Sequence, residues 1–307
     1  GSAKAGEADL IEQHPAMRRI LDAQRAWIDA GRVVAYRTAL ELDLLKHHGD
    51  AARREMAGRW CALVTPVLKA AWTDQAFHGA SACLQVFGGH GFVREWGIEQ
   101  IVRDSRVSMI YEGTNEIQAI DLLLRKTLPD GGTALLALLD ELKADLGTGA
   151  PARRAHDGLA RFAAFVRERL LPGVGAEGAP ADRAHWLADD FLRAMAMLLM
   201  AWAWARIDST PGAEAARWQD ALQAFWRWVW PEFDMRLSMM DATLADNPNE
   251  PVVTIAGVAD GARFVQGTKF SVSASAEDPV GVTGLRFALN APNGPPLADN
   301  LGALQID

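Results

Sequence analysis

The sequence has few cysteines, no long apolar run and no excess of positive charge. Its 307 residues include two cysteines, Cys61 and Cys83, which are too few for a disulfide framework or a zinc-binding pattern. We therefore expect a reducing, cytoplasmic compartment. The most apolar stretch, residues 194–205, has 12 residues, whereas a membrane span needs about 20. This stretch predicts a buried helix and no membrane span.

The charge balance excludes two classes of partner. The formal net charge is −8, and lysines and arginines are not clustered into one patch. Binding to nucleic acid or to an anionic membrane surface requires such a patch. We expect neither partner. The histidines also lack the spacing of metal ligands, so we predict no metal site.

Helical spacing of apolar residues dominates residues 1–129. His14-Pro15 can begin a first helix that includes residues 20–45, and Gly31 interrupts it at a cost of about 1 kcal/mol relative to alanine. A second helix is predicted over residues 51–86, with a kink or break near Pro66. Shorter helices follow over residues 98–109 and 115–128. The pattern predicts a mainly α fold, built as an antiparallel four-helix bundle.

Two further segments follow this bundle. Residues 130–246 read as additional helices, and they contain seven of the eleven tryptophans, which we interpret as core and interface packing. Residues 247–307 change to alternating, β-branched runs separated by turn residues, which is typical of strands. This tail predicts a small, partial β-structure, because a complete immunoglobulin-like sandwich needs about seven strands.

The residues with the most chemical information lie between Gln85 and Gln118. The cluster Gly88-Gly89-x-Gly91 exposes bare backbone where a helix ends; it either admits a bulky ligand or only terminates the helix. Glu112 stands between an apolar helix end and a new helix start. Apolar neighbours would raise the pKa of its carboxyl group toward that of a general base, although an ordinary exposed loop glutamate is the alternative.

Three motifs in this block resemble the C-terminal helical domain of acyl-CoA dehydrogenases. They are the Gln-x-x-Gly-Gly-x-Gly turn that begins at Gln85, the pair Arg103-Asp104, and residues 110–118 with the sequence IYEGTNEIQ. The similarity extends from residue 14 to residue 126. Residues up to about 244 look like the extra C-terminal segment of the subgroup that includes methylmercaptopropionyl-CoA dehydrogenase, and residues 251–289 resemble one edge of an immunoglobulin-like module.

The resemblance implies a flavin-dependent oxidoreductase that desaturates the α,β bond of an acyl-CoA thioester. Glu112 would be the base that removes the α-proton, and the backbone at Glu112-Gly113 would contact the substrate carbonyl. FAD would be contacted by Gln85, Gly88, Gly89, Thr114 and Glu116, the first three through a neighbouring subunit. Glu116 stands where relatives often have glutamine.

The same resemblance implies partners. A family member also has an N-terminal helical domain and a β-domain, so we expect a complementing chain that supplies these parts, or a homo-oligomer that covers the apolar surface of the helices. We also expect an electron-transfer acceptor. We expect the chain alone to have weak or no activity. The rival interpretation is a non-catalytic helical assembly or interaction module derived from the family.

Overall fold

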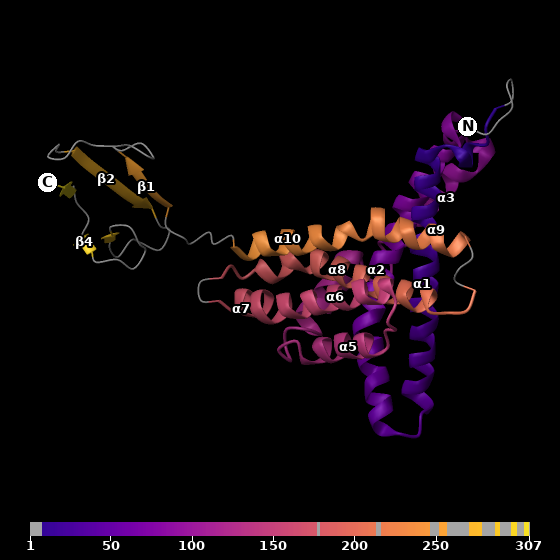
Figure 1. The fold of residues 1–307 in the computed structure, drawn as a ribbon, viewed down its shortest axis with the longest axis horizontal. Coiled ribbons are helices and arrows are strands. Elements are labelled where there is room, and N and C mark those ends of the chain that lie inside the picture. The colour runs from indigo at the N-terminus through magenta and orange to yellow at the C-terminus, as the bar shows by residue number, and fades with distance from the viewer. Residues whose placement is uncertain are drawn as a thin grey trace. The chain divides into compact units, whose positions relative to one another are not determined.

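The computed structural model describes residues 8–176, 179–212 and 216–245 in full, together with the backbone of five strands after residue 251. The chain divides into two units, Gly1–Ala245 and Asp246–Asp307, and each is described here by itself. The first unit consists of helices (Figure 1). The prediction of a mainly α fold is thereby confirmed.

Two long helices form a hairpin at the start of the first unit. Helix α1 (Pro15–His47) begins at a proline, and α2 (Ala51–Val86) begins after Asp50, whose carboxylate accepts a hydrogen bond from the Ala52 N–H at 3.0 Å. Helix α2 continues through Pro66, so the alternative of a break is not realised. Pro66 is buried, as are Leu63 and Val67 on the same helix, although proline cannot donate a backbone hydrogen bond there.

Shorter elements follow along α2. Two 3₁₀ turns, η2 (Gly88–Phe92) and η3 (Arg94–Trp96), lead into α3 (Ile98–Val107), which packs against α2. Helix α4 (Asn115–Ile120) also packs against α2 and continues as the π-helical turn η4 (Asp121–Arg125). The four predicted helices therefore occur in the expected order, but α3 and α4 are much shorter than the hairpin helices.

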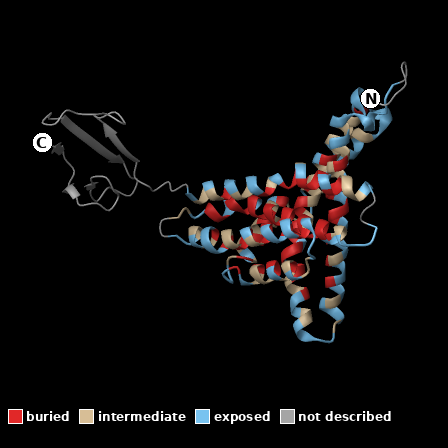
Figure 2. Ribbon diagram, in the orientation of Figure 1, coloured by how far each residue is buried: buried red, intermediate tan, exposed pale blue. Residues whose placement is uncertain are grey.

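The additional helices pack across the hairpin. They are α5 (Thr133–Ala144), α6 (Ala150–Phe165), η5 (Val166–Leu170), α7 (Leu171–Val174), α8 (Arg183–Asp208), α9 (Ala216–Ala224), η6 (Phe225–Val229) and α10 (Pro231–Ala245). Helix α8 contacts α1, α2, α4, α6 and α10. Buried residues concentrate around α8, whereas the far end of the hairpin is exposed (Figure 2). The core therefore lies where the additional helices meet α1 and α2.

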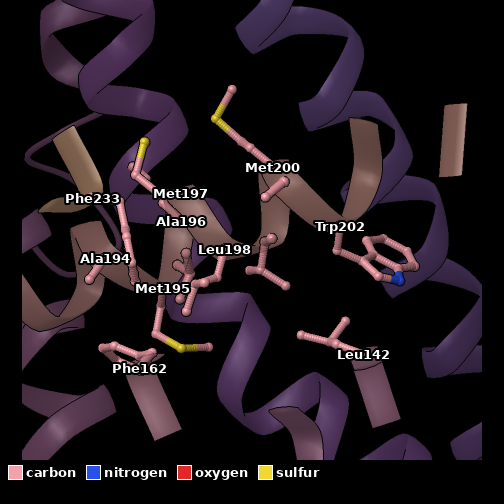
Figure 3. Packing of buried hydrophobic residues seen from close by; sticks show 14 of the residues in the cluster. Leu142, Phe162, Ala194, Met195, Ala196, Met197, Leu198, Met200, Trp202 and Phe233 are labelled. Atoms are coloured by element: carbon pink, nitrogen blue, oxygen red, sulfur yellow. The ribbon is translucent and has the colours of Figure 1, made fainter. Parts of the chain in front are cut away.

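The apolar stretch predicted as a buried helix lies in α8. Residues 194–205 are all buried, and their side chains pack against Leu142, Phe162 and Phe233 from neighbouring helices (Figure 3). Among the described residues, no helix is long and apolar enough to cross a membrane. Of the seven tryptophans in this region, four are buried and Trp186 is 55% exposed.

An ion pair joins the additional helices to the hairpin, and a close contact at Gly31 joins the two helices of the hairpin to each other. Arg193 of α8 binds Asp74 of α2 at 2.7 Å, and both side chains are largely buried. Gly31 is buried because the indole of Trp72 lies against it, in the space that a Cβ would occupy. Gly31 therefore serves helix–helix contact and does not merely weaken α1.

The second unit contains five described strands: β1 (Val252–Ala256), β2 (Phe270–Glu277), β3 (Arg286–Ala288), β4 (Pro296–Asp299) and β5 (Leu304–Ile306). They pair as a three-stranded antiparallel sheet in the order β1-β2-β5 and as the antiparallel pair β3-β4. The intervening segments of residues 247–307 lie outside the described residues. Strands occur where predicted, and the likeness to an immunoglobulin-like module stays a prediction.

Candidate functional site

The loop between α3 and α4 has an unusual backbone. Glu112 has a φ of 55°, the one positive φ among the described non-glycine residues, and Gly113 follows with a φ of 89°. A left-handed conformation costs a non-glycine residue about 1–2 kcal/mol. Such strain persists only when the surroundings hold it in place, and it often marks a functional segment. Contacts from neighbouring residues must therefore hold this loop in place.

Lys69, from the middle of α2, and Asn115, at the start of α4, hold this loop. The ammonium group of Lys69 donates to the Gly113 carbonyl at 2.6 Å and to the Asn115 Oδ1 at 3.0 Å. Asn115 is buried, accepts a second bond from the Thr73 hydroxyl at 3.1 Å and donates to the Ala70 carbonyl at 3.0 Å. We call these three side chains, Lys69, Thr73 and Asn115, the loop clamp. The clamp fixes where the loop lies on α2.

A second contact fixes the carbonyl of Glu112 itself. The Gln118 side chain donates to it at 3.2 Å from the next helix, whose first turn is capped by the Thr114 hydroxyl. The carboxylate side chain of Glu112 is exposed. The apolar surroundings expected for this carboxylate are thus not provided by the described residues, and the assignment of Glu112 as the base stays a prediction.

An apolar groove begins beside the loop clamp. It has a volume of about 820 Å³ and runs between α1, α2 and the start of α3. Lys69 lines it and also binds the Gly113 carbonyl, so the Glu112 loop is attached to the wall of the groove. The other lining residues include Trp27, Trp72 and Ile101. A concave apolar surface therefore adjoins the loop that carries the predicted base.

The predicted FAD-contacting turn lies elsewhere on α2. Gln85, Gly88 and Gly89 are exposed, and a Cβ added at either glycine would meet open space. Gln85 is 16 residues from Lys69, which corresponds to roughly 24 Å along a helix. The structure does not bring this turn and the Glu112 loop into one cluster, so the two segments would contact a ligand at separate places.

Thr114 and Glu116 occupy the start of α4. The Thr114 hydroxyl accepts a hydrogen bond from the Ile117 N–H at 3.3 Å. The pKa of the exposed Glu116 carboxyl is lowered, first by a hydrogen bond from its own backbone N–H and then by the Thr114 hydroxyl. Thr114 thus has a capping role that is independent of any cofactor.

The sequence indicated Glu112 and Gly113 but gave no signal for the loop clamp. Lys69 and Thr73 lie more than 40 residues before their partner Asn115 and sit in an otherwise ordinary helical pattern. Only the packing of α4 on α2 brings them together.

Comparisons with known proteins agree on one family. Residues 3–126 match the family model described as acyl-CoA dehydrogenase, C-terminal domain. The 3-methylmercaptopropionyl-CoA dehydrogenase of Ruegeria pomeroyi is 36% identical over 225 residues, which cover 72% of this chain and 38% of that protein. The broad-specificity linear acyl-CoA dehydrogenase FadE5 of Mycobacterium tuberculosis is 34% identical over 144 residues, 46% of this chain and 23% of that protein. The chain thus spans well under half of the length of these relatives.

A solved structure supports the same fold. The crystal structure of Caenorhabditis elegans ACDH-11 in complex with C11-CoA superposes with a TM-score of 0.51 at 18% sequence identity. The superposition covers 71% of this chain and 38% of that one. The predicted resemblance in sequence is confirmed by the family match, and the helical arrangement is shared.

Proposed function

We propose that this chain forms part of a flavin-dependent acyl-CoA dehydrogenase, because residues 3–126 match the C-terminal domain of that family. The proposed reaction is the α,β-desaturation of an acyl-CoA thioester. The chain spans 38% of the Ruegeria pomeroyi relative. The activity is therefore proposed for an assembly or a longer protein that contains this domain.

The Glu112 loop carries the proposal. Its backbone is held in a left-handed conformation by the loop clamp, and its carboxylate is free to face a substrate. We assign to Glu112 the removal of the proton on the α-carbon. The Glu112 N–H and the Gly113 backbone would contact the thioester carbonyl, so that charge developing on this oxygen is stabilised as the proton leaves. The adjoining apolar groove would hold an apolar part of the substrate near this loop.

FAD, when bound, supplies the acceptor for the hydride that leaves the β-carbon. The residues of this chain fit such a group as a set of surface contacts. Gly88 and Gly89 leave open backbone beside the exposed Gln85 amide, and no side chain crowds these positions. Thr114 and Glu116 would approach the flavin nucleotide at a separate place. Enclosure of the flavin requires residues outside this chain, either from a second copy or from a chain with the N-terminal and β-domains.

A chimera tests the proposal. Residues 3–244 of this chain would replace the corresponding C-terminal part of the Ruegeria pomeroyi 3-methylmercaptopropionyl-CoA dehydrogenase. We expect the chimera to hold flavin, which its yellow absorbance band reports, and to reduce an artificial electron acceptor when acyl-CoA is added. Glu112→Gln should abolish turnover and leave flavin absorbance unchanged, because an amide cannot accept the α-proton.

Glu99→Gln provides the matched control, because Glu99 is an acidic residue on α3 whose carboxylate pairs with Arg103 on the same helix. It should retain both flavin and turnover. A Glu112→Gln chimera with full turnover would disprove the assignment of the base. A chimera that holds flavin but does not turn over any acyl-CoA would favour the rival interpretation, a non-catalytic assembly module.

A further inference from the structure

A small pocket on the additional helices combines two arginines with a tryptophan. It has a volume of about 420 Å³ and is lined by Arg154, Leu222, Gln223, Trp226 and Arg227. Arg154 lies on α6, Leu222 and Gln223 on α9, and Trp226 and Arg227 on the π-helical turn η6. The lining contains no carboxylate. It lies outside the residues that match the acyl-CoA dehydrogenase domain.

Arg154 differs from Arg161 on the same helix. Arg161 pairs with Asp234 at 2.6 Å. Within the part of the chain that the structure describes, Arg154 and Arg227 form no ion pair; their charged ends lie over tryptophan rings. Both side chains are exposed and reach the same pocket, so two guanidinium groups are available there without a carboxylate in the lining.

A tryptophan of the pocket holds the guanidinium group of Arg154 in place. Arg154 lies 4.1 Å from the centre of the Trp226 ring, a cation–π contact that orients the guanidinium plane. Trp226 is buried and packs edge-on against Trp230 at 5.2 Å, so the ring cannot follow the arginine if it moves. The Arg227 guanidinium lies 5.9 Å from the ring of Trp228, which does not line the pocket. Of the two charges, that of Arg154 is therefore preorganised in the pocket before any ligand arrives.

One carboxylate lies close to the pocket but does not line it. Asp157 lies one turn after Arg154 and lines an adjacent pocket with Arg153 and Arg154. Among the described residues its ion pair is with Arg161, at 4.0 Å, and not with Arg154. The exposed Gln223 amide adds a neutral hydrogen-bond donor to the same pocket.

We propose that this pocket binds a phosphate-type oxyanion, either an inorganic diphosphate or the phosphate group of a small organic molecule. Planar guanidinium groups bind tetrahedral oxyanions through paired N–H donors, and two such groups from separate helices can grip one anion from two sides. The pocket volume exceeds that of a single ion and suits a diphosphate. The site is independent of the proposed dehydrogenase activity.

Calorimetric titration of the 307-residue chain with sodium pyrophosphate, at constant ionic strength, tests this site. We expect saturable binding with one anion per chain. Arg154→Gln and Arg227→Gln should each weaken binding by about tenfold or more, since each removes a charged donor. Arg227→Lys should bind with intermediate affinity, because lysine keeps the positive charge but lacks the paired N–H donors of the guanidinium group. Thermal melting of each variant confirms that it is folded.

Arg167→Gln is the matched control, because Arg167 is an exposed arginine on η5 and does not line this pocket. Its affinity for pyrophosphate should equal that of the unchanged chain. The proposal is overturned if binding does not saturate, or if Arg167→Gln weakens it as much as Arg154→Gln. It is also overturned if the chain binds vesicles of anionic lipid but no pyrophosphate, because the surface then recognises a membrane.

Discussion

Replacing Lys69 with methionine should loosen the Glu112 loop while the helical hairpin stays folded. Methionine keeps most of the apolar stem of lysine, so packing along α2 changes little. The substitution removes the donor to the Gly113 carbonyl and one of the two donors to Asn115. Asn115 retains its bonds with Thr73 and with the Ala70 carbonyl. The perturbation is thus confined to one side of the loop.

The expected loss follows from these two bonds. A hydrogen bond that involves a charged group contributes about 1.5–3 kcal/mol. The gain from Lys69 is smaller than twice this value, because burial disfavours its ammonium group and lowers its pKa, an effect that the nearby Glu116 and Glu112 carboxylates oppose. We expect Lys69→Met to lower the local stability of the loop by about 1–2 kcal/mol, which increases its open population roughly five- to thirtyfold.

Hydrogen exchange followed by mass spectrometry measures this change. Peptides that cover residues 108–118 should exchange roughly five- to thirtyfold faster in Lys69→Met under conditions where exchange reports local opening. Peptides from α8 should be unchanged. Lys46→Met is the control, because Lys46 is an exposed residue in the last turn of α1. Equal exchange of the loop in the Lys69 variant and in the unchanged chain would refute the clamp.

Three further predictions concern the fold. Gly31→Ala should lower the free energy of unfolding by about 1–3 kcal/mol in urea, because the new Cβ collides with the indole of Trp72; a gain in stability would contradict this. Arg193→Met should lower it by about 3 kcal/mol, since Asp74 is left buried without its guanidinium partner, and an unchanged urea midpoint would exclude a structural role for the pair. The lowered pKa of Glu116 contributes stability that is present above the ordinary value of 4.5 and is lost as the pH falls through the folded-state pKa. Glu116→Gln should remove this acid dependence from urea midpoints measured across that range.

The sequence predicted the helices well because their signals are local. The apolar spacing of residues 20–45 and the Asp50 cap define α1 and the start of α2 without reference to the rest of the chain. Pro66 shows the limit of such reasoning. Its propensity favours a break, but the buried neighbours of α2 keep the helix continuous. The sequence also did not show why residue 31 is a glycine, because this depends on the contact with Trp72 from another helix.

The candidate site was predicted in part for the same reason. The pair Glu112-Gly113 indicates an unusual turn, which the structure has. The resemblance of residues 110–118 to an acyl-CoA dehydrogenase motif identified Glu112 as the candidate base. Lys69 and Arg154 give no comparable signal, because each acts on residues more than 40 positions away. Lysines and arginines in helical patterns are usually solvated, so only tertiary packing distinguishes these two.

The geometry of the Glu112 loop and its enclosure are separate properties. Glu112 adopts its strained backbone in this chain without any covering domain, because Lys69 and Gln118 bind the two carbonyls of the loop. The direction of the Cα–Cβ bond of Glu112 is therefore fixed by α2 and α4. The polarity around the carboxylate is set by whatever covers the exposed side chain. For the proposed role of Glu112 as the base, a covering surface would not have to order the backbone of this loop, because that backbone is already in place.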